Sequence, residues 1–281
     1  MGDGGGLPDG AWGLRLPTLE GASAVLVVAP EWPAVELDVR YDCRSDAACP
    51  SDWTPEGMQV SLPAGGQLRI DWPHRVELSV PDSPEAECVV QPFLTTAAAS
   101  IALHGGHQPF HAGALGIDGA AWAILGDKEA GKSSTLALAA RMGVPVITDD
   151  LLVVADGLAL AGPRCLDLRE EPAAFIGGTK PLGMVGLRER WRLYLDPCPP
   201  ATPLAGFVVP TWGTDAVELL APVARLETIF ESSSLQGITM NDPGEYLWLA
   251  SLPTVEWSRP RDLSSASRSL ELLLAALARQ T

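Results

Sequence analysis

Short apolar runs, separated by proline and glycine, dominate the first third of the chain. Four of these runs have the length and composition of strands, at residues 25–28, 35–39, 68–70 and 76–80. The stretch 81–87 is acidic and carries proline, as linkers often do. We therefore expect a flexible tail over residues 1–10, a small β-rich domain over 11–92, and a second domain over 93–281.

In the second domain, strand-like runs alternate with segments of helical periodicity. A helix is predicted over residues 93–103, followed by a β-hairpin with arms at 110–117 and 120–125 around the turn Asp118-Gly119. A helical stretch comes next, at 134–142. Later strands are expected at 144–148, 151–154, 158–160, 191–195, 207–209 and 217–220, and later helices at 223–230 and 264–279. This alternation predicts an α/β fold.

Between the second hairpin arm and the helix that follows it, the chain matches the pattern G-x-x-x-x-G-K-[ST]. The matching residues are Gly126, Asp127, Lys128, Glu129, Ala130, Gly131, Lys132 and Ser133, with Ser134 directly after them. Glycine at both ends permits backbone angles closed to other residues, so the loop N–H groups can surround a polyphosphate. Lys132 is expected to reach the β- and γ-phosphates and Ser133 to bind Mg²⁺, while the helix start adds its positive dipole end. The alternative is an ordinary strand-to-helix turn with a chance lysine.

Two adjacent carboxylates, Asp149 and Asp150, end the next apolar run, about one helix after Lys132. Phosphoryl transfer needs a bound metal and an oriented acceptor hydroxyl, and a carboxylate near the γ-phosphate serves either task. Neighbouring side chains on an extended segment point to opposite faces, so one aspartate is expected at the metal and the other at the acceptor. We assign Ser133 and Asp150 to the metal, while the sequence leaves open which aspartate is the base. The alternative is a solvated acidic loop.

The chain is strongly acidic, with 35 Asp and Glu against 19 Lys and Arg and a formal net charge of −16 over 281 residues. This charge argues against a nucleic-acid or anionic-membrane partner and favours an uncharged or basic protein partner. Arg188, Arg190 and Arg192 alternate along a predicted strand and therefore share one face. They either bind a phosphate or acidic substrate or form a solvated strand face.

Neither the cysteines nor the histidines predict a metal site or a disulfide framework. The five cysteines are scattered without a C-x-x-C pair, which favours a reducing cytoplasm. His104, His107 and His111 are close in sequence, but glycines and a proline between them break any helix that would bring them together. The chain has no apolar run of the ~18 residues that a membrane span needs, and no signal-peptide pattern at its start. We therefore expect no membrane association.

Three segments together resemble the catalytic domain of HPr kinase/phosphorylase, over roughly residues 93–279. They are His111-Ala112-Gly113-Ala114-Leu115, the glycine loop at 126–133, and Thr148-Asp149-Asp150. The resemblance implies a P-loop core of the type shared with PEP carboxykinases, with ATP and Mg²⁺ as cofactors. It also implies that His111 lies near the γ-phosphate and that the Asp pair contains the base and a magnesium ligand.

The chain departs from the HPr kinase pattern after the Asp pair. HPr kinases carry an E-x-R-G-x-G signature there, whereas this chain has Asp167-Leu168-Arg169-Glu170-Glu171-Pro172, in which Arg169 is the matching arginine and the glycines are absent. This difference argues against HPr as the substrate. The chain is more similar to stand-alone HPr-kinase-like proteins of bacterial biosynthetic clusters, some of which phosphorylate a serine of a lasso peptide precursor. Residues 257–263 resemble a recurring segment of that group.

From these features we expect an ATP- and Mg²⁺-dependent kinase that transfers the γ-phosphoryl group to a serine hydroxyl of a peptide or protein. The expected catalytic residues are Asp149, Asp150, His111 and Lys132. Two alternatives remain: an ATP hydrolase or nucleotide switch, in which an aspartate orients water, and a peptide-binding module whose loop is inactive. The acceptor and the oligomeric state cannot be predicted from this sequence.

Overall fold

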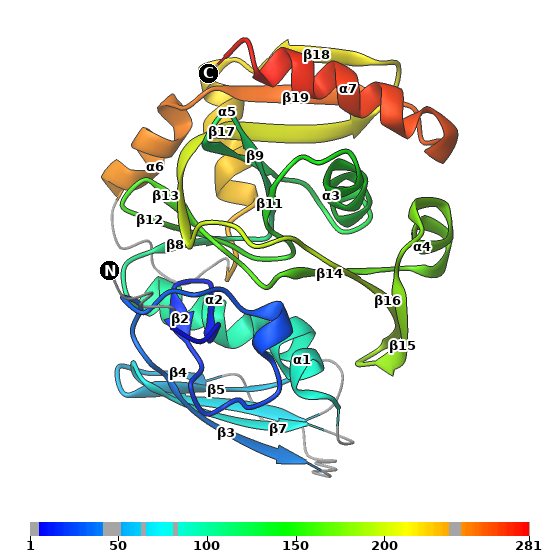
Figure 1. The fold of residues 1–281 in the computed structure, drawn as a ribbon. Helices are drawn as coiled ribbons and strands as arrows, with labels where there is room; N and C mark the ends of the chain where they lie inside the picture. Colours follow the sequence, from blue (N-terminus) through cyan, green and yellow to red (C-terminus); the bar gives the residue numbers. More distant parts are fainter. Residues whose placement is uncertain (1–5, 42–51, 63–65, 81–83, 236–242, 281) are drawn as a thin grey trace, which may run out of the picture.

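The computed structural model describes residues 6–41, 52–62, 66–80, 84–235 and 243–280. A nine-stranded sheet lies in one half of the molecule and a five-stranded sheet in the other (Figure 1). A three-stranded and a two-stranded sheet complete the β structure of the described ranges. The combination of helices with mixed sheets agrees with the expected α/β class.

The five-stranded sheet is formed by N-terminal residues in the order β3-β7-β6-β5-β4. Its strands are β3 (Glu36–Tyr41), β4 (Asp52–Trp53), β5 (Gly57–Ser61), β6 (Gln67–Asp71) and β7 (Arg75–Val80). Three of the four predicted N-terminal strands are therefore present. The prediction for residues 25–28 was wrong, because the short helix η1 (Ser23–Val25) and an isolated bridge from Val27 to Gly10 occupy that segment.

The predicted flexible tail extends too far into the chain. Gly10 pairs with Arg15 in a short ribbon of β1 (Gly10–Ala11) and β2 (Leu14–Arg15). The Arg15 guanidinium also donates a hydrogen bond of 2.8 Å to the Asp9 carboxylate. Residues 9 and 10 are therefore part of the fold, whereas residues 1–5 lie outside the described part of the chain.

Helix α2 (Thr95–His104) lies between the two halves of the molecule (Figure 1). It follows α1 (Ala86–Cys88) and the irregular turn η2 (Val89–Phe93). One apolar cluster joins Leu68 of the N-terminal sheet, the buried residues of α2, and Val153 of the nine-stranded sheet. The expected boundary between residues 92 and 93 therefore falls inside a core that both halves share.

Within the described ranges, no single helix is long and apolar enough to cross a membrane. The bent pair Ala86–Phe93 and Thr95–His104 passes that test by length and composition only, and most of α2 is buried in the core.

The nine-stranded sheet follows the path β11-β9-β10-β17-β13-β12-β8, and β19 pairs with both β17 and β18. Its strands are β8 (Gln108–Phe110), β9 (Gly113–Ile117), β10 (Ala120–Ile124), β11 (Val146–Thr148), β12 (Leu152–Ala155), β13 (Leu158–Leu160), β17 (Ala201–Trp212), β18 (Ala216–Leu219) and β19 (Thr254–Arg259). Strand β10 runs parallel to β17 and is buried on both faces, with Trp122 in one apolar cluster and Ala123 in another. Burial on both faces explains its continuous apolar sequence.

Helices cover both faces of this sheet (Figure 1). Helices α3 (Lys132–Arg141) and α7 (Ala266–Leu277) contribute Leu136 and Leu270 to one apolar cluster. Helices α5 (Pro222–Glu231) and α6 (Pro243–Ser251) contribute Ile229 and Leu249 to the cluster on the other face. The predicted helices at 134–142, 223–230 and 264–279 correspond to α3, α5 and α7, whereas α6 was missed.

The predicted hairpin is present, but its first arm is shorter than expected. Strands β9 and β10 pair around Asp118 and Gly119, whose φ angles of 50° and 81° suit the tight turn predicted there. Phe110 belongs to β8, which pairs with β12 instead. A hydrogen bond from the Ala112 N–H to the Phe110 carbonyl closes a turn at His111 and separates the two strands.

A separate three-stranded sheet, in the order β14-β16-β15, lies beside α3 (Figure 1). It consists of β14 (Cys165–Leu168), β15 (Lys180–Val185) and β16 (Arg188–Tyr194), and α4 (Glu170–Ile176) follows β14. Only β16 was predicted. Helix α4 has seven residues and contains Pro172, so its sequence carries too little periodicity to reveal a helix.

Candidate active site

The loop between β10 and α3 requires glycine at both ends. Gly126 and Gly131 have φ angles of 119° and 80°, in the left-handed region that favours glycine. A Cβ on Gly131 would also come within 2.9 Å of the Arg259 guanidinium. Helix α3 begins directly after Gly131, its N-cap residue, which has no side chain that could cap the helix start. Its first N–H groups and the positive end of its dipole therefore suit an anion.

Lys132 is folded back over this loop. Its side chain is buried, and Nζ donates hydrogen bonds to the carbonyls of Gly126 and Asp127, the latter at 3.1 Å. Burial lowers the pKa of Lys132, whereas the nearby Asp149 raises it. The ammonium group is thus held at the loop in a poorly solvated position.

Asp149, rather than Asp150, is the partner of Ser133. The Ser133 hydroxyl donates a hydrogen bond of 3.1 Å to Oδ1 of Asp149, which is only 3% exposed. Burial and, after it, the charge of Asp150 raise the pKa of Asp149 from 3.8 to about 7. The assignment of Ser133 and Asp150 to the metal remains a prediction, and this contact adds Asp149 as a second candidate.

The Asp pair lies in a bend after β11 and not on an extended segment. Asp150 has a φ of 62°, so the simple alternation of faces expected from a strand does not apply. Its side chain faces the same pocket as Lys132, while Asp149 lies behind that surface. The two carboxylates still point to different environments. The cause is the turn at Asp150, and not the alternation of side chains along a strand.

His111 lies in the turn between β8 and β9, and its side chain contacts the Asp150 backbone. Its Nδ1 is 3.1 Å from the Asp150 carbonyl, which can only accept, so Nδ1 carries the proton. Shielding from water lowers the pKa of His111, as does the charge of Lys132. The imidazole is therefore neutral at pH 7. His104 is bound elsewhere, because its ring stacks on Trp72 at 4.5 Å.

Gln91, from the turn η2 before α2, holds the Asp150 side chain. Its Nε2 donates a hydrogen bond of 2.8 Å to Oδ2 of Asp150, and the Gln91 residue is 2% exposed. The Gln91 carbonyl in turn accepts a bond of 2.9 Å from Arg192. This contact joins the N-terminal half of the chain to the candidate site, and no motif in the sequence pointed to it.

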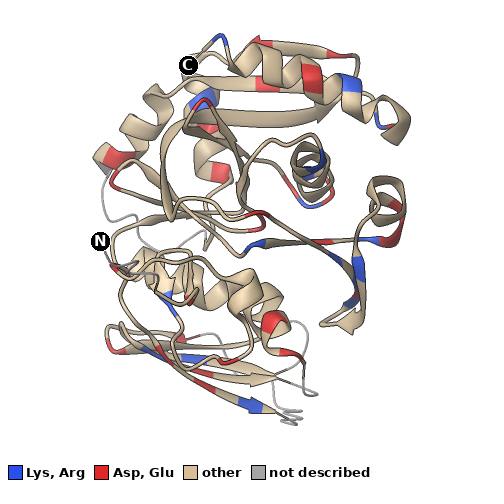
Figure 2. Cartoon of the chain, in the orientation of Figure 1, with Lys and Arg blue, Asp and Glu red and all other residues tan. Residues whose placement is uncertain are grey.

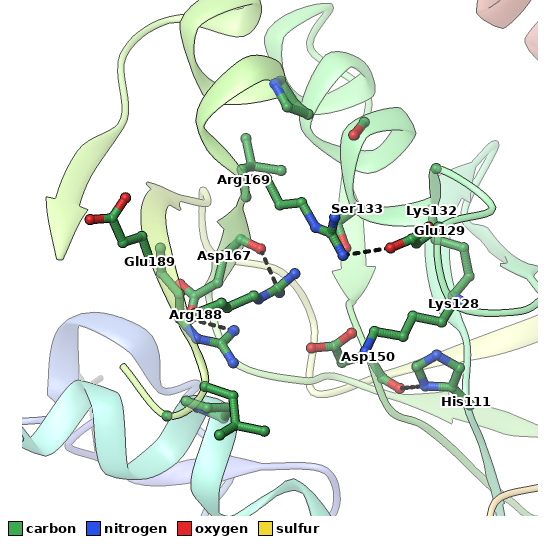
Figure 3. A pocket seen from close by; sticks show the side chains of 18 of the residues that line it. His111, Lys128, Glu129, Lys132, Ser133, Asp150, Asp167, Arg169, Arg188 and Glu189 are labelled. Atoms are coloured by element: carbon green, nitrogen blue, oxygen red, sulfur yellow. Dashed lines mark hydrogen bonds and ion pairs between the residues drawn. The ribbon is translucent and has the colours of Figure 1, made fainter. Parts of the chain in front are cut away.

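These residues surround a pocket of about 960 Å³ (Figure 3). The predicted residues that line it are His111, Asp127, Lys128, Glu129, Gly131, Lys132, Ser133, Ser134 and Asp150. Gly126, Ala130 and Asp149 do not line it. The first two belong to the loop backbone, and Asp149 accepts the hydrogen bond of the Ser133 hydroxyl. The opposite wall comes from η2, α2 and the β15–β16 turn, including Pro92, Phe93 and Leu187.

Three arginines of β16 surround Asp167 at this opposite wall. Arg192 is fully buried and donates to both carboxylate oxygens of Asp167, at 2.8 and 2.9 Å. Arg190 is 8% exposed and Arg188 lines the pocket, as Figure 3 shows for the latter. The alternative of a solvated strand face is therefore wrong for Arg190 and Arg192. Arg169 pairs with Glu129 of the loop at 2.8 Å.

Arg259 supports the loop from the other side. Its guanidinium donates to the Ala130 carbonyl and lies between the rings of Trp212 and Trp257, at 4.4 and 4.2 Å from their centres. Burial lowers the pKa of Arg259 to about 10. Sequence motifs gave no role to Arg259, although the resemblance singled out the segment that contains it.

Asp149 is expected to make the stability of the protein depend on pH. Because its pKa is raised from 3.8 to about 7, the folded protein keeps a proton that the unfolded chain has lost. The free energy of unfolding should therefore fall as the pH rises from about 4 to about 7, with no further loss above that range. Thermal unfolding of metal-free protein should show a smaller slope in Asp149→Asn than in the wild type. Equal slopes would contradict this account.

Comparisons with known proteins do not assign this chain to a family. No protein-family model and no curated protein sequence matches the chain. Among solved structures, the HPr(Ser) kinase/phosphatase from Coxiella burnetii is 12% identical, with a TM-score of 0.31, over 61% of this chain and 97% of that chain. Because this score is too low to establish a common fold, we base the function on the geometry of the site.

Proposed function

We propose that the protein is an ATP- and Mg²⁺-dependent kinase that transfers the γ-phosphoryl group to the hydroxyl of a serine in a peptide or protein. The observation that carries this proposal is that the glycine loop, with Lys132 and Ser133, and the Asp150 carboxylate line the same pocket. The anion-binding elements and the carboxylate come from separate segments. Phosphoryl transfer requires both of them.

The loop and the start of α3 are proposed to hold the phosphates. The glycine angles free backbone N–H groups to point at an anion, and Lys132 adds a positive charge that burial protects from screening. On binding, its Nζ would exchange bonds to the loop carbonyls for bonds to phosphate oxygens. In this arrangement the loop stabilises negative charge that develops on the transferring group.

Ser133 and Asp149 are proposed to hold Mg²⁺. A hydroxyl and a carboxylate 3.1 Å apart are the hard oxygen ligands that this ion prefers, and it commonly takes only one or two of them beside phosphates and water. The raised pKa of Asp149 agrees with this role, because a buried carboxylate without enough positive charge nearby would gain from a cation. When bound, the ion would neutralise charge on the phosphate oxygens.

Asp150 is proposed to orient and deprotonate the acceptor. The hydroxyl proton would move to its carboxylate while the hydroxyl oxygen bonds to the γ-phosphorus, and the bond from that phosphorus to the bridging oxygen breaks to release ADP. Neutral His111 donates its Nδ1 proton to the Asp150 carbonyl, so its Nε2 can only accept a hydrogen bond, and the ring adds no charge beside the phosphates.

The acceptor is decided by product analysis. The protein is incubated with γ-labelled ATP and either purified HPr or candidate precursor peptides, and the phosphate is located by mass spectrometry. We expect phosphoserine on a peptide and none on HPr. Release of inorganic phosphate without any acceptor would favour a hydrolase, and failure to bind ATP would favour a peptide-binding module.

Gln91→Leu is expected to lower kcat by roughly tenfold while leaving the KM for ATP unchanged. Removing the amide frees the Asp150 carboxylate from one orientation, and a misplaced base affects the chemical step more than nucleotide binding. Gln108→Leu is the matched control, because Gln108 is also buried and donates to a carboxylate, that of Glu245 in α6. An equal loss of kcat in both variants would show that only general stability had changed.

A further inference from the structure

We propose that Arg190, together with Arg188, binds a carboxylate of the acceptor, supplied by an aspartate or glutamate close to the phosphorylated serine. The inference rests on the proposed kinase function and specifies its substrate. It places a second anion-binding position in the pocket, on β16 and opposite the glycine loop.

Arg190 has unused hydrogen-bonding capacity at a buried position that lines the pocket. Its Nε donates to the Val185 carbonyl at 3.0 Å, and its Nη1 is buried without a hydrogen-bond partner among the described residues. Its Nη2 makes no hydrogen bond to the described residues and is the nitrogen left to meet a ligand in the pocket. Oδ2 of Asp167 lies 3.6 Å from Nη1 of Arg190, and both oxygens of that carboxylate already accept bonds from Arg192. A ligand carboxylate in the pocket would supply the missing acceptor.

The charges around Arg190 also do not balance. Arg190 and Arg192 share the carboxylate of Asp167, while Arg188 donates to the Asp167 backbone carbonyl. The other acidic partner of Arg192, Glu87, also accepts a bond from Tyr194. Burial lowers the pKa of Arg190, and the charge of Arg188 lowers it further. A buried cation that lacks full compensation is costly, so this cluster favours an anionic ligand.

The local charge differs from the charge of the whole chain. Six Lys and Arg and five Asp and Glu line the pocket. The whole chain has 19 Lys and Arg against 35 Asp and Glu, which gives a net charge of −16. Because charges beyond about 8 Å are largely screened at physiological salt, an acceptor group in the pocket responds to the local set. The expectation of an uncharged or basic partner, drawn from net charge, is therefore replaced by that of an acidic one.

The position of the arginines assigns this anion to the acceptor and not to the nucleotide. The glycine loop with Lys132 forms one wall and provides the phosphate position, while Arg188 lies across the pocket from it and Asp150 faces the same space (Figure 3). Arg190 lines the same pocket and lies two residues after Arg188 on β16. Pro92, Phe93 and Leu187 lie on that second wall and offer apolar contacts to neighbouring acceptor residues. Acidic and basic residues are both spread along the ribbon (Figure 2).

The test uses two synthetic peptide pools with a fixed central serine. The three positions on each side are drawn from Asp and Glu in one pool and from Asn and Gln in the other, so the pools differ in charge but little in shape. We expect the wild type to phosphorylate the acidic pool with a kcat/KM at least about tenfold higher, as a charge-assisted hydrogen bond implies. Arg190→Gln should bring this ratio close to one, and Arg188→Gln should lower it.

Arg268→Gln, at an exposed position of α7, makes the same charge change outside the pocket and should keep the full ratio. If Arg190→Gln does not fold, the ratio measured for Arg188→Gln decides. Equal use of the two pools by the wild type, or an unchanged ratio in both pocket variants, would overturn the inference.

Failure of the inference can be separated from failure of the kinase assignment. Binding of a non-hydrolysable ATP analogue is measured in parallel by calorimetry. If the analogue binds and neither pool is phosphorylated, the acidic peptide acceptor is overturned and the nucleotide site stands. If the pocket variants raise the KM for ATP equally with both pools and keep the ratio, the arginines serve the nucleotide and the inference is wrong.

Discussion

Replacing Lys132 by alanine is expected to abolish measurable phosphoryl transfer and to weaken ATP binding. The ammonium group lies at the loop in a buried position, where its attraction for phosphate oxygens is weakly screened. Loss of one preorganised electrostatic contact to a transition state commonly costs about 10²–10³ in kcat, and here ground-state binding is lost as well. Initial rates with γ-labelled ATP and titration calorimetry with a non-hydrolysable analogue would measure both effects.

Two further variants make this result specific. Lys132→Met keeps most of the buried volume, so it should show the same loss if charge is the cause and not packing. Lys180→Ala removes an exposed lysine of β15 that pairs with Glu85, and should behave as the wild type. Normal turnover in Lys132→Ala would remove the basis for the phosphate-binding assignment.

Asp149→Asn and Asp150→Asn should each lower turnover by roughly 10²-fold or more, but for different reasons. Asp149 is hydrogen-bonded to Ser133, so its variant should require much more Mg²⁺ for half-maximal activity. Asp150 faces the pocket, so its variant should stay slow even at saturating Mg²⁺. Both should bind the ATP analogue with nearly the affinity of the wild type.

The measurement is a set of rate curves against Mg²⁺ concentration at fixed ATP for the wild type and both variants. Identical curves for the two variants would contradict the division of roles between the aspartates. Near-normal rates in both at saturating Mg²⁺ would place the catalytic centre elsewhere. A reversed pattern, with the metal requirement changed in Asp150→Asn, would restore the assignment of Asp150 to the metal that the sequence suggested.

Local sequence determined the glycine loop between β10 and α3. The apolar run of β10, the two glycines with positive φ and the start of α3 lie within about one strand, one turn and one helix of each other. Such short-range features depend on backbone sterics and periodicity, which a sequence displays directly. The Asp118-Gly119 turn and the buried leucines of α7 were predictable for the same reason.

Contacts between distant segments could not be predicted in this way. Gln91 is 59 residues before Asp150, and Arg259 is 129 residues after Ala130, yet each is hydrogen-bonded to its partner. No period or spacing in the chain encodes these pairs, because they depend on how η2 packs against the nine-stranded sheet and on where β19 joins that sheet. The same packing closes the pocket with residues of the N-terminal half.

The tertiary structure also decided what chemically similar residues do. The sequence placed Asp149 and Asp150 side by side, but only the bend at Asp150 and the position of Ser133 directed one carboxylate into the interior and the other to the pocket. The sequence likewise placed three alternating arginines on one strand face, and only the packing of β16 against η2 and β14 buried two of them around Asp167. Residue type and spacing determined which chemistry was available, whereas burial, which depends on the whole fold, determined where each charge can act.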